Sequence, residues 1–182
     1  ALRIAAQSDP RIRLVHRIGR RGLSSAVVEG IQSTSAPLIA VMDADLQHDE
    51  TLLPRMVEQF SDPDLDLVVG SRYVAGGGVG NWSKDRQTVS RVATKMAHVI
   101  IKADLSDPMS GFFMVRRTAF DASARQLSNQ GYKILLDIIA SSPRRLKIKE
   151  LPFEFGLREH GESKLDSMVT WEYIALLLDK SI

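Results

Sequence analysis

Short apolar runs alternate with longer amphipathic stretches along this chain. Residues 38–42 and 66–71 are dominated by consecutive apolar side chains, which is typical of strands that are buried on both faces of a sheet. Residues 22–33, 50–60 and 88–101 instead carry apolar side chains at helical spacing. Strands that alternate with helices of about ten residues predict an α/β fold with a mostly parallel sheet.

Further segments toward both ends follow the same two periods. The first residues predict the end of a helix and a turn at Asp9-Pro10. The run "YKILLDIIA" predicts a helix over residues 132–140. Additional strands are expected over residues 13–16, from Phe112 onward, and over residues 146–155, where "LKIKELPFEF" alternates.

Composition limits the kinds of protein that this chain can be. Its 182 residues, 44% hydrophobic and 25% charged, are sufficient for one globular domain with its own core. The sequence contains no cysteine, which excludes disulfides, thiolate nucleophiles and cysteine-based zinc sites. The net charge of +2 indicates no particular polyanionic partner.

The chain shows neither a secretory signal pattern in residues 1–10 nor an apolar run of the roughly 18 residues that a membrane helix needs. We expect one α/β domain over residues 1–166, followed by an amphipathic helix over residues 167–182. The apolar face of that helix either lies on a bilayer surface or packs on the domain.

The pair Asp43 and Asp45 follows directly on a buried strand. Side chains alternate along an extended segment, so both carboxylates point to the same side, with Ala44 opposite. Two hard oxygen ligands suit Mg²⁺ or Mn²⁺ that bridges a diphosphate. Gln47 offers a further oxygen, and His48 a ligand or a hydrogen bond. The alternative is that both aspartates only cap the helix that is expected near residue 50.

Four cations stand at strand ends or in polar, glycine-containing loops rather than along a helix: Arg72, Arg86, Arg158 and Lys164. Guanidinium groups bind phosphate oxygens in pairs, so convergence of these cations on the aspartates predicts a substrate with two separate phosphates. A glycine-rich loop over residues 76–80 is expected to be mobile and to close over it. For each cation singly, the alternative is an exposed surface charge.

Other classes of protein fit the sequence less well. Nucleic-acid binding predicts a basic stripe with interleaved aromatic residues, whereas aromatic residues make up only 6% of the chain and its cations are dispersed. A serine hydrolase predicts a G-x-S-x-G turn, and none is present. We interpret Lys133 and the pair Arg144-Arg145 as surface residues.

Four motifs then resemble one family. "VMDADLQHDE", "GSRYVAGGGVGNW", "SDPMSGFFMVRR" and "REHGESKL" occur in this order in polyprenyl-phosphate (dolichyl-phosphate) mannose synthases, which are inverting transferases of the GT-A fold in glycosyltransferase family two. The resemblance extends from about residue 11 to residue 165.

The resemblance implies transfer of mannose from GDP-mannose to the phosphate of a long isoprenoid lipid at the cytoplasmic face of a membrane. It implies that Asp43 lies near the nucleotide, and that Asp45, together with Asp43 and Gln47, holds Mg²⁺ or Mn²⁺ on the diphosphate. With Asp45, it implies catalytic roles for Arg72 and Arg86, which engage the phosphates. The substrate-binding residues that it implies are Asp43, Asp107, Ser110, Arg158, Ser163 and Lys164.

The chain also departs from the family pattern. Its members normally begin with two strands that end in "PTYNE"-like and "DDGS"-like motifs, and neither motif is present in this sequence. We therefore expect a domain that lacks its N-terminal strands. The alternatives are transfer of glucose or another sugar to polyprenyl phosphate, and a non-catalytic nucleotide-binding or membrane-scaffold module.

Overall fold

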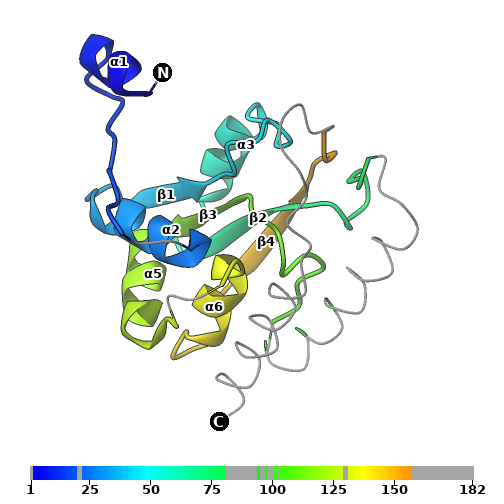
Figure 1. The fold of residues 1–182 in the computed structure, drawn as a ribbon. Coiled ribbons are helices and arrows are strands. Elements are labelled where there is room, and N and C mark those ends of the chain that lie inside the picture. Colours follow the sequence, from blue (N-terminus) through cyan, green and yellow to red (C-terminus); the bar gives the residue numbers. More distant parts are fainter. Residues whose placement is uncertain are drawn as a thin grey trace.

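The computed structural model describes residues 2–19, 22–80, 94, 97, 101, 103–128 and 131–156, which build a mixed sheet between layers of helices (Figure 1). The described strands are β1 (Leu38–Val41), β2 (Leu67–Ser71), β3 (Phe113–Arg116) and β4 (Ile148–Pro152). Their order across the sheet is β1-β3-β2-β4, which leaves β2 and β3 in the centre.

The sheet contains more antiparallel pairing than the sequence pattern predicts. β2 and β4 pair in parallel, from Leu67 opposite Ile148 to Ser71 opposite Pro152, whereas β3 runs antiparallel to both β1 and β2. An α/β fold is confirmed. The described strands β1, β2 and β4 run in the same direction and β3 is reversed, so the expected mostly parallel direction holds although two of the three described pairings are antiparallel. Periodicity does not reveal direction, because a strand that is buried on both faces has the same apolar pattern either way.

The helices form a layer on each side of the sheet (Figure 1). One face is covered by α2 (Leu23–Gln32), α5 (Arg117–Ser123) and α6 (Ile134–Ala140), and the other face by α3 (Leu52–Gln59). A short 3₁₀ helix, η1 (Ala124–Gln126), follows α5.

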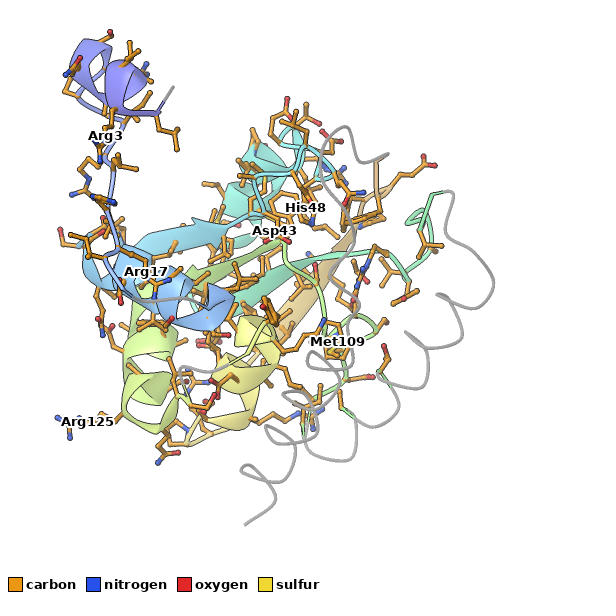
Figure 2. All side chains as sticks on the ribbon, in the orientation of Figure 1. Arg3, Arg17, Asp43, His48, Met109 and Arg125 are labelled. Atoms are coloured by element: carbon orange, nitrogen blue, oxygen red, sulfur yellow. The ribbon has the colours of Figure 1, made fainter. Side chains whose placement is uncertain are left out.

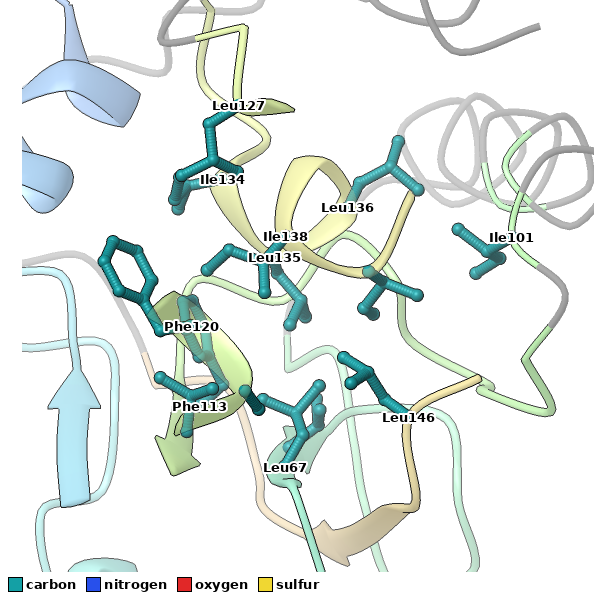
Figure 3. Packing of buried hydrophobic residues seen from close by; sticks show 14 of the residues in the cluster. Leu67, Ile101, Phe113, Phe120, Leu127, Ile134, Leu135, Leu136, Ile138 and Leu146 are labelled. Carbon is teal, nitrogen blue, oxygen red and sulfur yellow. The ribbon is translucent and has the colours of Figure 1, made fainter. Parts of the chain in front are cut away.

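Alternation along the central strands produces two separate cores. Leu67 and Val69 of β2 point into the larger core with Phe113 of β3, where α6 packs over them (Figure 3). Val68, between them, points into the smaller core with Met56 of α3. Each of these side chains is fully buried, and each such burial contributes about 1.5–3 kcal/mol.

The N-terminal helix α1 (Leu2–Ser8) lies apart from these layers (Figure 1), and none of its residues is buried. The helix and the turn after it were both expected, and the Asp9 carboxylate accepts the Arg11 N–H at 2.9 Å in that turn. Residues 13–16 form no strand, so the prediction of a strand there is wrong. A strand is stable only when its backbone pairs with a neighbour, and no described strand pairs with these residues.

The other expected elements within the described residues are confirmed, with ends shifted by a few residues. The prediction that residues 38–42 are buried on both faces is wrong, because β1 lies at the edge of the described sheet and only its Ile39 is buried. The sequence does not predict α5, because its seven residues follow β3 without a turn signal and have no clear period. Of the helix expected over residues 88–101, only Thr94 and Ala97 are described as helical, and the helix expected over 167–182 lies outside the described residues. Among the helices that are described, none combines the length and apolar character needed to cross a bilayer.

Candidate active site

Several of the predicted site residues that the structure describes lie at one edge of the sheet. The chain leaves β1 into the acidic turn at residues 43–47, leaves β2 at Arg72, and enters β3 from a turn at residues 106–112. Because β3 is reversed relative to β1 and β2, all three connections lie at the same edge. Figure 2 shows Asp43 and His48 close together there.

The acidic turn is closely packed and locally strained. Asp43 lies against Gly111, where an added Cβ would come within 2.6 Å of the Asp43 Oδ2, so only glycine leaves room for the carboxylate. Asp45 accepts the N–H of Gln47 at 3.3 Å. Leu46, between them, has a φ of 61°, a left-handed conformation that costs a residue with a side chain about 1–2 kcal/mol. Strain of this kind is concentrated in functional turns.

Gln47 joins the acidic turn to the chain that follows β4. Its Nε2 donates to the carbonyl oxygen of Gly156 at 2.9 Å, and the Gly156 N–H donates back to the Gln47 carbonyl oxygen at 2.9 Å. The amide nitrogen of this buried side chain is therefore turned toward Gly156, while its Oε1 is the atom suited to a hard cation.

The alternative that the aspartates cap a helix is excluded. α3 begins after Thr51, and the carboxylate next to its start belongs to Asp49. Asp49 Oδ1 accepts the Thr51 N–H at 3.0 Å and the Thr51 hydroxyl at 2.6 Å. Asp43 and Asp45 are thus not required for the helix.

Arg72 and Asp107 form a bidentate ion pair at this edge. Arg72 Nε and Nη2 each donate to the Asp107 carboxylate at 2.7 Å, and the Arg72 main-chain N–H donates to it at 3.1 Å. The Asp107 side chain is fully buried and that of Arg72 is 9% exposed. Burial opposes the charge of Arg72, but the pair with Asp107 outweighs it and raises the pKa of Arg72 above its ordinary value. The guanidinium also lies 5.6 Å from the Phe155 ring centroid.

Asp107 and Ser110 belong to a turn that is fixed at several points. The Ser110 hydroxyl donates to the Gly70 carbonyl oxygen at 2.7 Å and accepts the Phe112 N–H at 3.1 Å, which ties the start of β3 to the end of β2. Glu150 of β4 accepts the main-chain N–H groups of residues 106–107 at 2.8 and 3.1 Å. The contacts found for Asp107 and Ser110 therefore lie within the protein, and their predicted role in substrate binding stays a prediction.

His48 is packed among aromatic rings beside the acidic turn. Its ring centroid lies 5.3 Å from that of Phe112 and 5.5 Å from those of Phe153 and Phe155. Burial lowers the pKa of His48, although the negative charge of the acidic turn opposes this shift. The residues described offer its Nδ1 no hydrogen-bond partner. His48 is thus neutral at neutral pH, and its role as a ligand stays a prediction.

Lys133 is a cation that the sequence analysis misinterpreted as a surface residue. It stands at the N-cap of α6 and is half-buried, within electrostatic reach of Arg72, Asp107 and Asp43. Burial and then the charge of Arg72 lower the pKa of Lys133. A cation at a helix N-terminus opposes the helix dipole, and this local conflict was the one available sequence signal for a functional lysine.

The glycine-rich loop over residues 76–80 packs closely against the ends of β2 and β4, and its predicted mobility stays a prediction. An added Cβ at Gly77 would lie 2.6 Å from the Ser71 carbonyl oxygen, so the loop folds back tightly on the end of β2. The Gly78 N–H donates to Phe153 at 3.1 Å, and the Phe155 N–H donates to Gly78 at 2.9 Å. The sequence predicts a mobile loop here, but main-chain hydrogen bonds hold this part of it beside the continuation of β4.

The donor atoms of the acidic turn fit a divalent cation. Asp43 and Asp45 supply hard carboxylate oxygens and Gln47 an amide oxygen, which is the ligand chemistry of Mg²⁺ and Mn²⁺. Within the described residues, no group of three or more His, Asp or Glu side chains is placed to hold a metal by itself. An ion in this turn would therefore also need oxygens from the amide or from a bound phosphate.

The structure brings part of the predicted site together. Asp43, Asp45 and Arg72 all act electrostatically on His48, and Asp107 binds Arg72 directly. The predicted residues Arg86, Arg158, Ser163 and Lys164 lie outside the described residues.

Comparison with known proteins then decides the family. Residues 1–123 match the glycosyl transferase family 2 model. The chain belongs to this family. The dolichol-phosphate mannosyltransferase of Pyrococcus furiosus is 37% identical over 165 residues, which are 90% of this chain and 46% of that protein. The dolichol-phosphate mannosyltransferase of Saccharomyces cerevisiae is 38% identical in an alignment of 178 positions that covers 94% of this chain and 65% of that protein. The chain thus spans about half to two thirds of the length of these relatives.

Solved structures of this kind share the fold. Glucosyl-3-phosphoglycerate synthase from Mycobacterium tuberculosis, in complex with Mn²⁺, UDP-glucose and phosphoglyceric acid, has a TM-score of 0.66 and 19% identity over 96% of this chain and 58% of that one. At this identity the likeness concerns the fold alone, and it confirms the expected GT-A architecture.

Proposed function

We propose that this family 2 chain is the catalytic part of an inverting transferase that moves mannose from GDP-mannose to a dolichyl or other polyprenyl monophosphate. One observation supports the proposal: at a single sheet edge the Asp43 carboxylate lies within electrostatic reach of the buried cation of Arg72, and Asp43, Asp45 and Arg72 all lie within electrostatic reach of His48. The two dolichol-phosphate mannosyltransferases that resemble the chain support the choice of sugar and acceptor.

The charges at this edge suit two phosphorylated substrates. Arg72 is already neutralised by Asp107, whereas Lys133 adds a further cation near Asp43. A Mg²⁺ or Mn²⁺ ion held by Asp43, Asp45 and the Gln47 oxygen would neutralise the diphosphate of the donor and stabilise it as it departs. Lys133 and the guanidinium of Arg72 attract the remaining phosphate oxygens.

The chemistry needs no strong general base. An acceptor monophosphate has a second pKa of about 6 and is an anion at neutral pH. One of its oxygens forms the bond to the anomeric carbon while the bond from that carbon to the diphosphate breaks, so negative charge moves onto the departing GDP. A single in-line displacement inverts the anomeric centre. The neutral, packed state of His48 is consistent with this mechanism.

A polyprenyl acceptor requires action at a membrane, and we place the enzyme at its cytoplasmic face. The amphipathic pattern of residues 167–182 supports contact of that segment with the bilayer surface. Arg86, Arg158, Ser163 and Lys164 complete the phosphate-binding set in this proposal.

The first test removes one carboxylate of the acidic turn. We expect Asp45→Ala to reduce transfer of radiolabelled mannose from GDP-mannose to polyprenyl phosphate by at least about a hundredfold, because charge on the departing diphosphate is no longer neutralised. The matched control is Asp64→Ala, since that side chain is 82% exposed at the opposite end of the sheet. Undiminished transfer by the Asp45 variant would contradict the role of the turn.

A second measurement addresses the substrate. Calorimetry with GDP, with and without Mn²⁺, is expected to show binding that depends on the metal in the unaltered chain and not in Asp45→Ala. Absence of such binding would instead favour a non-catalytic module. Transfer of glucose from UDP-glucose in preference to mannose would contradict the proposed donor.

A further inference from the structure

The described part of the site contains a carboxylate that the mechanism above does not use. Glu150 stands on β4 opposite Val69 of β2 and is partly buried. Its Oε2 accepts the N–H of Ser106 at 2.8 Å, and its Oε1 accepts the N–H of Asp107 at 3.1 Å. Both oxygens of one side chain thus bind two consecutive main-chain amides.

These two amides immediately precede Pro108, which has no N–H of its own. On the far side of the proline, the Ser110 N–H donates to the Asp107 carbonyl oxygen at 3.3 Å and closes the turn. The main chain at residues 106–107 therefore depends on Glu150 for the bonds that orient it. Hydrogen bonds to an ionised acceptor are the stronger kind, at about twice the strength of neutral ones.

The orientation of this main chain determines where the Asp107 carboxylate points. That carboxylate receives three N–H bonds from Arg72, two from the guanidinium and one from the main chain. Arg72 is the first residue after β2, and β2 is the strand that pairs with β4. A relay therefore runs from Glu150 through Asp107 to Arg72, with each contact shorter than 3.2 Å.

We propose that Glu150 is a positioning residue, which fixes the turn at residues 106–107 so that Asp107 holds the Arg72 guanidinium in the orientation that phosphate binding requires. The expected effect of Glu150 on kcat rests on the proposed function. Its expected effect on the orientation of Asp107 and Arg72 does not. Glu150 need not touch either substrate, because it acts on the reaction only through the aspartate.

The structural test uses hydrogen exchange in the intact protein without substrate. In Glu150→Ala, the amide of Arg72 is expected to exchange at least about tenfold faster than in the unaltered protein, because its acceptor on Asp107 is no longer held in place. Glu150→Gln supplies one carbonyl oxygen in place of two, so it is expected to restore part of the protection. Unchanged protection at Arg72 in Glu150→Ala would overturn the proposal.

The kinetic test separates positioning from general stability. Glu150→Ala is expected to lower kcat for mannose transfer at least about tenfold per folded molecule, whereas Glu58→Gln, on the exposed face of α3, leaves it unchanged. A lower urea midpoint with unchanged kcat would show a merely structural role and overturn the proposal.

A double variant decides whether the effect passes through Asp107. In the Asp107→Asn background, Glu150→Ala is expected to add almost no further loss of kcat, because residues that act through one partner are not additive. A full multiplicative loss would show an independent action and overturn the relay. If the unaltered protein transfers no sugar at all, the proposed function fails, and the exchange of the Arg72 amide still decides the role of Glu150.

Discussion

The two ends of β2 carry the same ion pair in different surroundings. Asp66, just before the strand, accepts bonds from both Arg144 Nη atoms at 2.6 and 2.7 Å. Asp107 accepts bonds from the Nε and Nη2 atoms of Arg72, just after the strand, both at 2.7 Å. Each carboxylate also accepts a main-chain N–H, from Lys147 at 2.9 Å for Asp66 and from Arg72 at 3.1 Å for Asp107.

The difference lies in what surrounds each pair. Arg144 is 61% exposed, whereas Arg72 is 9% exposed and shares its surroundings with Asp43 and Lys133. An arginine in water can lose its partner and remain solvated, but a buried arginine cannot. The comparison teaches that a bidentate ion pair does not by itself mark an active site. The further charges near Arg72, those of Asp43 and Lys133, are what distinguish its surroundings from those of Arg144.

The largest effect is expected for neutralisation of Asp107, compared with the same substitution at Asp66. Asp107→Asn leaves the buried charge of Arg72 without compensation and should cost about 3–5 kcal/mol in the free energy of unfolding, together with a reduced but measurable kcat for mannose transfer. Asp66→Asn should cost only about 1 kcal/mol, because Arg144 turns to solvent, and should preserve transfer. Urea denaturation and the transfer assay measure both quantities. Equal destabilisation by the two substitutions would break the comparison.

A smaller effect on mannose transfer is expected for Lys133, the additional cation near one end of β2. Lys133→Met removes a half-buried ammonium group that attracts phosphate, so kcat/KM should fall about tenfold or more, while the free energy of unfolding should stay the same or rise. Lys149→Met, on the exposed side of β4, is the matched control and should change neither quantity. Steady-state kinetics at varied GDP-mannose, with urea denaturation in parallel, provides the measurement. Unimpaired transfer by Lys133→Met would remove this lysine from the site.

The smallest effect is the change with pH in the stability that the Asp66–Arg144 pair contributes. Burial raises the pKa of Asp66, but Arg144 and the Lys147 N–H outweigh it, so the folded pKa lies below the usual 3.9 or so. A group with a lowered folded pKa contributes stability above its unfolded pKa, and this contribution disappears as pH falls through the folded value. The difference in urea midpoint between the unaltered protein and Asp66→Asn should thus be constant from pH 7 to about 5 and shrink below about 4. A difference in urea midpoint that grows on acidification would show that the pKa of Asp66 is raised, rather than lowered, in the folded protein.

Much of the fold follows from the sequence alone. The apolar runs before Asp43 and Arg72 predicted β1 and β2, and the helical period predicted α2, α3 and α6, because side-chain period directly encodes which faces are buried. Paired carboxylates after an apolar run likewise indicated a site at a strand end. These signals are local, so a single stretch of residues is sufficient to reveal them.

Tertiary structure decided the rest. The reversal of β3, the pairing of Arg72 with Asp107 and the relay from Glu150 all join residues that are distant in the sequence. Lys133 has the same local sequence whether it is exposed or packed beside Arg72, so only the assembled sheet and α6 determine its charge environment. Long-range pairing and burial set the energies of buried charges, and neither is written in the period of a single segment.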